Sequence, residues 1–149
     1  MLWRRGGLIA TYLDSWQAAY KYDYKVRTDF FNDIQSICTE LGVNVFFKRK
    51  RNNPRVHKGY LDFIQSFVKN ENVFEIDPGV SAFRLCKQFN VVLSMPFTAS
   101  SVVADFYGKD AAYYDSTGII QKNDKAAHNL IVISGKAELR DYLNNIFKN

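Results

Sequence analysis

Residues 90–118 (NVVLSMPFTASSVVADFYGKDAAYYDSTG) decide the fold, because they predict a buried strand, a tight turn, a helix and a second strand in direct succession. The apolar run VVL at residues 91–93 is typical of a strand that is buried on both faces of a parallel sheet. Pro96 ends that strand, Thr98 is a candidate N-cap, and apolar residues then recur at helical spacing as far as a glycine. A short strand over residues 111–114 follows and leads into the turn sequence Asp-Ser-Thr-Gly.

The rest of the chain alternates in the same way. Apolar patterns predict further strands over residues 7–13, 43–47, 73–76 and 130–133. They predict further helices over residues 24–41, 60–68, 82–89 and 137–146, whereas Ser134 and Gly135 read as a turn and residues 17–23 and 119–127 show no clear pattern. This alternation predicts an α/β fold with three layers, in which a Rossmann-like parallel sheet of about six strands carries helices on both faces.

Composition indicates one ordinary globular domain over residues 1–149, since 47% of the residues are hydrophobic and no linker interrupts the pattern. The net charge of +5 suits an anionic ligand but is small for a dedicated nucleic-acid binder, so we expect no nucleic acid as a partner. Cys38 and Cys86 fall on apolar helix faces as reduced core residues, and no Cys/His cluster predicts a metal. Without a signal peptide core or a membrane-spanning run, we expect a cytoplasmic protein, with the inner face of the cytoplasmic membrane as a peripheral location.

The unusual stretches of the sequence all follow a predicted strand. They are residues 14–16, 48–58, 77–79, 95–101 and 115–118. In open parallel sheets, ligands bind outside the carboxyl ends of the strands, and a helix that starts there directs amide N–H groups at one spot suited to phosphate. Each stretch also has a plainer explanation: hydroxyls that only cap a helix, a solvated basic loop, or ordinary turns.

Several catalytic signatures are missing. No GxGxxG sequence follows the first strand, which argues against a dinucleotide site of the usual kind, and no GxxxxGK[ST] sequence indicates a P-loop. No nucleophile elbow and no Ser/His/Asp arrangement can be supported by spacing alone. The two histidines, His57 and His128, stand by themselves in the sequence, and a lone histidine is more often structural than catalytic.

The sequence resembles the C-terminal half of a family of bacterial surface carbohydrate biosynthesis proteins. The resemblance rests on FFKRKR (46–51), IDPGVSAFRL (76–85), residues 91–124, AAH (126–128) and ISGKAEL (133–139). Its most specific part is SMPFTAS followed by YYDSTG, although the family form of the second turn has Pro where this chain has Ser116. Such proteins are similar to GT-B glycosyltransferases, in which two Rossmann-like domains face each other and the C-terminal domain holds the nucleotide-sugar donor.

The resemblance implies a site, a substrate class and a missing partner. By this analogy the helix start takes the donor phosphate, basic residues neutralise its charge, and the remaining positions lie near base, ribose or sugar. The residues so implied are Thr98, Ala99, Ser100 and Ser101 for phosphate, Lys48, Lys50 and His57 for charge, Asp77 and Val80 for the base, and Tyr114 and Asp115 for ribose or sugar. The donor is a CMP-, CDP-, UDP- or GDP-linked sugar, no further cofactor is expected, and an N-terminal domain or partner chain would supply the catalytic base.

Two other functions stay open from the sequence. One is a non-catalytic nucleotide- or anion-binding module of a polysaccharide assembly system. The other is a sugar-nucleotide epimerase-like or hydrolase half-domain, which would need an acid/base pair such as Asp115 and His128, the candidate catalytic residues that this chain itself offers.

Overall fold

The computed structural model describes residues 4–11, 24–48, 58–77 and 79–148. Its centre is a fully parallel sheet that, in these described ranges, has six strands in the order β3-β2-β1-β4-β5-β6. The strands are β1 (Arg4–Thr11), β2 (Val43–Lys48), β3 (Val73–Glu75), β4 (Val91–Ser94), β5 (Asp110–Asp115) and β6 (Ile131–Ser134). The predicted α/β fold is therefore confirmed. Strand order reverses between β1 and β4, which lie side by side although 80 positions separate Thr11, at the end of β1, from Val91, at the start of β4.

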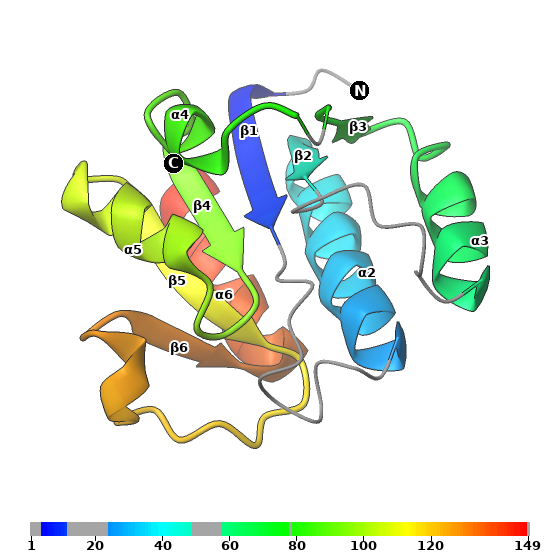
Figure 1. Ribbon diagram of the computed structural model, residues 1–149. Coiled ribbons are helices and arrows are strands. Elements are labelled where there is room, and N and C mark those ends of the chain that lie inside the picture. Colours follow the sequence, from blue (N-terminus) through cyan, green and yellow to red (C-terminus); the bar gives the residue numbers. More distant parts are fainter. Residues whose placement is uncertain (1–3, 12–23, 49–57, 78, 149) are drawn as a thin grey trace.

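Helices cover both faces of the sheet and make it the middle of three layers (Figure 1). The helices are α2 (Tyr24–Leu41), α3 (Lys58–Phe67), α4 (Ala82–Cys86), α5 (Ala99–Phe106) and α6 (Gly135–Phe147), with a 3-10 turn η1 (Lys125–Ala127). Helices α2, α3 and α6 share one apolar cluster with the sheet, and α4, α5 and η1 share the other. Neighbouring strand residues divide between the clusters: Val91 and Leu93 face α2, whereas Val92 faces α5.

Helix α2 confirms its predicted bounds at both ends. Phe30, Phe31, Ile34 and Ile37 are buried along the face that meets the sheet. Gly42 follows with a φ of 69°, a left-handed conformation that glycine adopts without the steric cost of a side chain, and β2 begins at the next residue. The chain thus turns from helix to strand within one residue.

Three predicted boundaries were wrong. Helix α4 ends at Cys86, three residues before its predicted end. Ser134 and Gly135 form no separate turn, because Ser134 is the N-cap of α6 and Gly135 is already its first residue, with a φ of 81° that needs glycine. Strand β1 begins three residues earlier than predicted, since Arg4 already pairs with Val43 across an irregularity in the register. Residues 119–127, which showed no pattern, contain η1, where the Asp124 carboxylate accepts a hydrogen bond from the Ala126 amide.

Candidate functional site

The carboxyl ends of β2, β1 and β4 lie next to one another at the point where strand order reverses. Thr11 is the register partner of both Lys48 and Ser94, so three consecutive strands end at the same level of the sheet. We call the edge at which the parallel strands end the carboxyl edge. In open α/β sheets this crevice between the two halves of the sheet is the usual place for a ligand.

The turn from β4 into α5 is tight and strained. Phe97 has a φ of 68°, a left-handed conformation that is uncommon for a residue with a bulky side chain. Its ring packs at 5.8 Å from the ring of Tyr113, and the Thr98 amide donates a hydrogen bond to the Met95 carbonyl. Packing therefore holds a backbone conformation that costs about 1 kcal/mol or more, and such conformations concentrate at functional sites.

Thr98 occupies the N-cap position of α5 but does not use its hydroxyl as a cap. Its φ and ψ of −90° and 131° are those of an N-cap, yet its side chain makes no capping hydrogen bond. The hydroxyl is buried, with the residue only 6% exposed, and Thr98 Oγ1 has no hydrogen-bond partner among the described residues. A buried hydroxyl without a hydrogen-bond partner lowers the stability of the folded protein. This atom is therefore the feature of the turn that most suggests a bound ligand.

The other predicted residues of this helix start are placed differently. Ser101 lies inside the protein, where its Oγ is 2.5 Å from Ser94 Oγ and donates to the Ala112 carbonyl at 3.0 Å. The Ser100 carbonyl accepts a hydrogen bond from the Cys86 thiol, and Ser100 is buried as well. Ala99 is exposed in the first turn, where the amide groups have no intrahelical acceptor. Ser101 thus ties α5 to β4 and β5, and Thr98 is left as the hydroxyl that a ligand could use.

Lys48 lies at the end of β2 on the same face of the sheet as α5. Phe47 belongs to the α2 cluster, so the alternation of side chains turns Lys48 to the opposite face, the one on which Ser94 meets Ser101. Lys48 is only 4% exposed, and burial lowers the pKa of its ammonium group while the charge of Asp77 acts in the opposite direction. A cation is therefore held at the carboxyl edge, two strands from the start of α5.

The turn after β3 is fixed by Asp77. Its Oδ1 accepts a hydrogen bond from the Gly79 amide at 2.7 Å, and its carbonyl accepts one from the Val80 amide at 3.0 Å. Asp77 itself is exposed, whereas Val80 is half-buried against the α4–α5 cluster. The structure thus brings Asp77 near enough to Lys48 for their charges to interact at the carboxyl edge.

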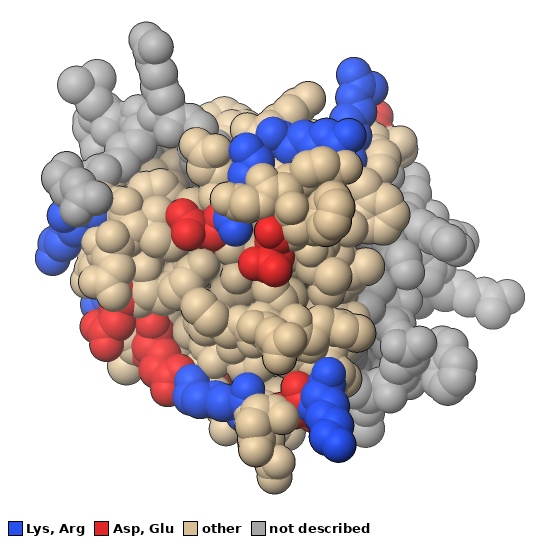
Figure 2. All heavy atoms as spheres, turned by 90° about the vertical axis from the view of Figure 1, so that its left-hand side faces the viewer, with Lys and Arg blue, Asp and Glu red and all other residues tan. Residues whose placement is uncertain are grey.

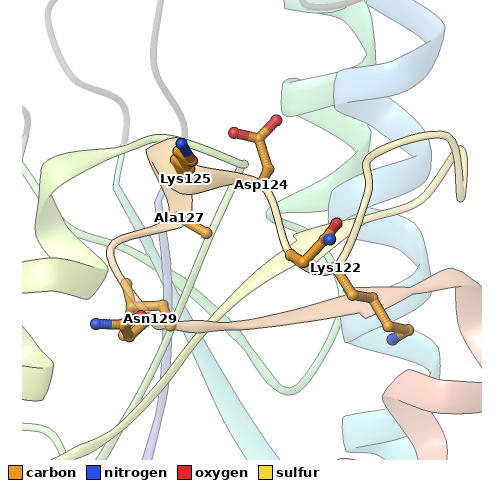
Figure 3. A pocket seen from close by; sticks show the side chains of 7 residues that line it. Lys122, Asp124, Lys125, Ala127 and Asn129 are labelled. Carbon is orange, nitrogen blue, oxygen red and sulfur yellow. The ribbon is translucent and has the colours of Figure 1, made fainter.

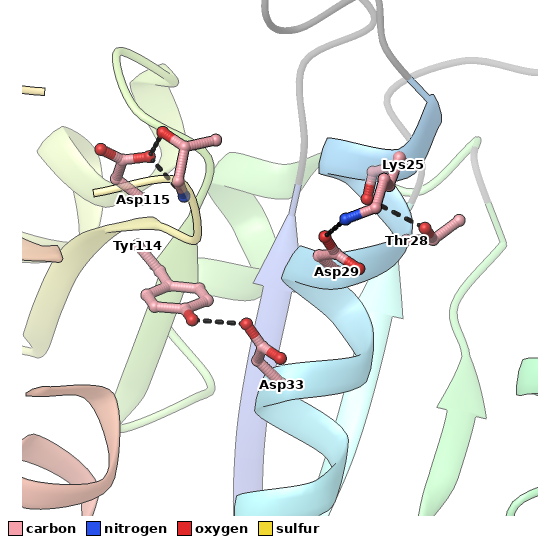
Figure 4. A network of polar contacts seen from close by, with 7 residues as sticks. Lys25, Thr28, Asp29, Asp33, Tyr114 and Asp115 are labelled. Carbon is pink, nitrogen blue, oxygen red and sulfur yellow. Dashed lines mark hydrogen bonds and ion pairs between the residues drawn. The ribbon is translucent and has the colours of Figure 1, made fainter. Parts of the chain in front are cut away.

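Asp115 organises the turn at the end of β5 (Figure 4). One carboxylate oxygen accepts hydrogen bonds from the Thr117 amide at 3.0 Å and from the Thr117 hydroxyl at 2.5 Å, and the other accepts one from the Ile120 amide at 2.8 Å. The residue is almost fully buried. Its carboxylate is thus engaged in holding residues 115–120, which leaves little capacity for a catalytic base.

Tyr114 points away from Asp115, as expected for neighbours in a strand, and reaches helix α2 (Figure 4). Its hydroxyl donates a hydrogen bond to Asp33 Oδ2 at 2.6 Å, and its ring lies 5.8 Å from the Phe30 ring. Burial raises the pKa of Asp33 despite this bond, and burial with the Asp33 charge raises the pKa of Tyr114 far above its ordinary value. Asp33 was missed in the sequence because a polar residue on an otherwise apolar helix face reads as solvent-exposed.

Asp115 and His128 do not form an acid/base pair. Asp115 pairs with Ser134 at the carboxyl end of β6, whereas His128 precedes the first residue of that strand, so the two lie at opposite ends of a strand about 13 Å long. His128 is exposed and left-handed, with a φ of 51°, and its amide donates to the Lys125 carbonyl. The prediction of a local catalytic pair is therefore wrong.

A small pocket of about 310 Å³ lies in the connection from β5 to β6, away from the carboxyl edge (Figure 3). Its lining residues are Lys122, Asn123, Asp124, Lys125, Ala127, Asn129 and Leu130. The Lys122 ammonium donates to the Glu138 carboxylate and to the Val132 carbonyl on the outer edge of β6. The ammonium group of this lining residue is thus engaged by Glu138 and by the edge strand.

Some predicted positions lie outside the described residues: Lys50, His57 and residues 14–16. Within the described ranges, no group of three or more His, Cys, Asp or Glu side chains is arranged to hold a metal ion. No helix among those residues is long and apolar enough to cross a membrane. Cys38 and Cys86 are buried free thiols, as predicted, and burial raises their pKa values to about 12 and about 11.

The parallel sheet with helices on both faces defines a Rossmann-like α/β fold. The chain resembles a crystal structure of UDP-GlcNAc 2-epimerase from Methanocaldococcus jannaschii in complex with UDP-GlcNAc and UDP, with a TM-score of 0.62 and 14% sequence identity. The likeness covers 96% of this chain but 38% of that protein, so the chain spans less than half of its length. No curated protein sequence matches the chain.

The chain belongs to the family described as polysaccharide biosynthesis PFTS motif protein, whose pattern it matches over residues 11–143. The resemblance to a carbohydrate biosynthesis family is therefore confirmed. In one-letter code, the motif in the family's description differs from residues 96–99 (PFTA) only at the fourth letter, and Ser100 follows directly. We take residues 96–99 as this chain's counterpart of the motif, which is the strained turn that carries Thr98.

Proposed function

We propose that this domain is the nucleotide-sugar donor-binding half of a GT-B-like glycosyltransferase that acts in the biosynthesis of bacterial surface polysaccharides. The observation that carries the proposal is the Thr98 hydroxyl, which is buried at the start of α5 and at the switch point of the sheet and has no partner in the described part of the chain. The family membership supports polysaccharide biosynthesis, and the fold is compatible with a nucleotide-sugar ligand.

The chemistry of the turn suits a phosphate oxygen. The N-terminus of a helix carries a partial positive charge and amide groups with no intrahelical acceptor, so it stabilises an anion. The Thr98 hydroxyl would donate one more hydrogen bond, and among the residues that the structure describes it gives up no other bond by doing so. Lys48 lies on the same face at the end of β2, two strands away, where its positive charge would attract the negative charge of a phosphate.

In the proposed reaction this domain binds the donor and stabilises the leaving phosphate. Hydrogen-bond donors of the protein that are already in place before negative charge develops on the leaving group make the largest electrostatic contribution to such a transfer. The acceptor hydroxyl needs a general base to remove its proton. Asp115 is poorly suited to this role, because its carboxylate already accepts hydrogen bonds from the amides of its own turn. We therefore place the base on another domain or chain, and we expect the isolated domain to bind a nucleotide without turning it over.

A second candidate is an epimerase-like half-domain, which the fold of the archaeal epimerase favours. Both candidates share the binding step and differ in the reaction. Transfer of the sugar to an acceptor by the complete protein would support the glycosyltransferase, whereas release of an isomerised nucleotide sugar without an acceptor would support the epimerase.

The binding step is tested by thermal unfolding of the domain with UDP, CDP, CMP and GDP. A ligand at 100 times its dissociation constant stabilises a protein by about 2.7 kcal/mol, which raises the melting temperature measurably. The variant Thr98→Val keeps the shape of the side chain and removes the hydroxyl, and we expect it to weaken nucleotide binding about tenfold. Thr39→Val is the matched control, because Thr39 lies in α2 and bonds to Gln35, far from the carboxyl edge.

Stabilisation by none of the four nucleotides would contradict the proposal. Equal affinities of Thr98→Val and the wild type would show that a nucleotide binds elsewhere. Lys48→Met should also weaken binding and should reduce its dependence on salt concentration, since a charge interaction would be lost.

A further inference from the structure

Helices α4 and α5 expose three aromatic side chains on the face opposite α2. Phe83 is 52% exposed, Phe106 is 84% exposed and Tyr107 is 45% exposed. Apolar side chains that are scattered singly over a surface need no explanation, but neighbouring exposed aromatics indicate an interaction surface. The two helices lie side by side in Figure 1.

The aromatic residues are connected through a basic residue. Lys87 Nζ lies 5.0 Å from the centre of the Tyr107 ring, and the Tyr107 and Phe106 rings are 5.5 Å apart. Phe83 precedes Lys87 by four positions at α4 and its C-cap, so both lie on one side of that short helix. The three rings therefore belong to one continuous surface.

Positive charge surrounds these rings. Arg84 and Lys87 are exposed, and Lys109 follows the α5 turn with its ammonium group 3.4 Å from Asn90 Oδ1. Asp105 is an exposed carboxylate beside them, and Asp110, which directly follows Lys109, is exposed as well. We define the aromatic–basic surface as Phe83, Arg84, Lys87, Phe106, Tyr107 and Lys109.

We propose that the aromatic–basic surface docks on an anionic lipid bilayer. Aromatic side chains prefer the interface between lipid and water, and lysine and arginine beside them are attracted to anionic headgroups. The most exposed ring, Phe106, stands at the last turn of α5, where it can enter the headgroup layer without movement of the backbone. Figure 2 shows a row of basic side chains along the upper part of the α5 side of the molecule, with acidic side chains directly below it, and charges of both signs along the lower part.

The position of this surface keeps it separate from the carboxyl edge. Thr98 precedes α5 and Phe106 ends it, which places them about 12 Å apart along the helix. A bilayer at the end of α5 would therefore leave the start of α5 open. The docking proposal does not depend on the nature of the ligand at Thr98.

The test is co-sedimentation of the domain with vesicles. We expect binding to vesicles that contain phosphatidylglycerol in phosphatidylcholine, little binding to phosphatidylcholine alone, and weaker binding at high salt. The double variants Phe83→Ser/Phe106→Ser and Arg84→Gln/Lys87→Gln should each reduce the bound fraction about tenfold or more. All four side chains are exposed, so folding should persist, which circular dichroism would check.

Matched controls lie elsewhere on the surface. Ile131→Ser removes an apolar side chain that is 56% exposed on β6, and Lys125→Gln removes an exposed charge on η1. Both controls should bind vesicles as the wild type does. Absence of binding, equal binding to neutral vesicles, or loss in the controls equal to that in the variants would overturn the proposal. Self-association that Phe83→Ser/Phe106→Ser abolishes, without any effect of lipid, would identify a protein interface instead.

Discussion

The turn after β4 and the turn after β5 lie at adjacent strand ends, since Ser94 pairs with Tyr113. They differ in whether their buried polar side chain has a hydrogen-bond partner. In the β5 turn, the Asp115 carboxylate accepts three hydrogen bonds from Thr117 and Ile120. In the β4 turn, the Thr98 hydroxyl is equally buried and has no partner among the described residues. One turn is complete in itself, and we propose that a bound ligand completes the other.

This contrast separates two kinds of polar residue that look alike in a sequence. Polar groups that are satisfied within the protein contribute to its stability, and their removal should lower the free energy of unfolding. A polar group that is left for a ligand contributes nothing to the free protein, and its removal should affect binding alone. Stability and affinity measured on the same variants therefore distinguish the two turns.

The largest expected effect is that of Asp115→Ala. The substitution leaves two amides and one hydroxyl without their acceptor, and we expect the free energy of unfolding to fall by about 3 kcal/mol. Chemical denaturation measures this change. Asp77→Ala is the control, since Asp77 is exposed and its side chain bonds to the Gly79 amide, and it should cost about 1 kcal/mol or less. Equal losses in both variants would show that the β5 turn is not specially stabilised.

The sequence predicted the strands of the sheet and the long helix α2 well. The apolar run of residues 91–93 and the helical periodicity of residues 24–41 both depend only on local spacing along the chain. It predicted that residues 95–101 gather polar groups at one edge, but not which hydroxyl is used internally. Ser101 bonds to Ala112, eleven positions away, and Tyr114 bonds to Asp33, 81 positions away. Such pairings depend on how strands and helices pack, so a single sequence does not reveal them.

Ser101→Ala should show the second-largest effect on stability. It removes the hydroxyl that links Ser94 to the Ala112 carbonyl, and both of these buried groups lose a partner. We expect the free energy of unfolding to fall by about 2 kcal/mol, while nucleotide affinity per folded molecule changes little. If affinity falls and stability does not, Ser101 acts on the ligand and the division between the hydroxyls of this turn is wrong.

Asp33→Asn should change how stability depends on pH. The folded protein holds the Asp33 proton more tightly than the unfolded chain, because its pKa is raised above 3.8, so ionisation above that pH favours unfolding. The variant should therefore gain stability relative to the wild type between acid and neutral pH. Glu40→Gln should lose stability relative to the wild type as the pH rises from acid to neutral. The hydrogen bond from Arg140 lowers the pKa of Glu40, so the Glu40 carboxylate stabilises the folded protein at neutral pH. Denaturation at several pH values compares the two variants.

The smallest expected effect on stability is that of Thr98→Val, and it is the one that separates the two turns most sharply. Replacement of a capping threonine ordinarily lowers stability by about 1 kcal/mol. Here the hydroxyl makes no capping bond and is buried without a partner in the ranges that the structure describes, so the methyl group of valine should leave the free energy of unfolding unchanged within about 0.5 kcal/mol, or should raise it. A loss of 1 kcal/mol in the absence of nucleotide would mean that the hydroxyl serves the fold, as the carboxylate of Asp115 does. Unchanged stability together with weaker nucleotide binding would mean that the turn after β4 holds its hydroxyl in place for a ligand.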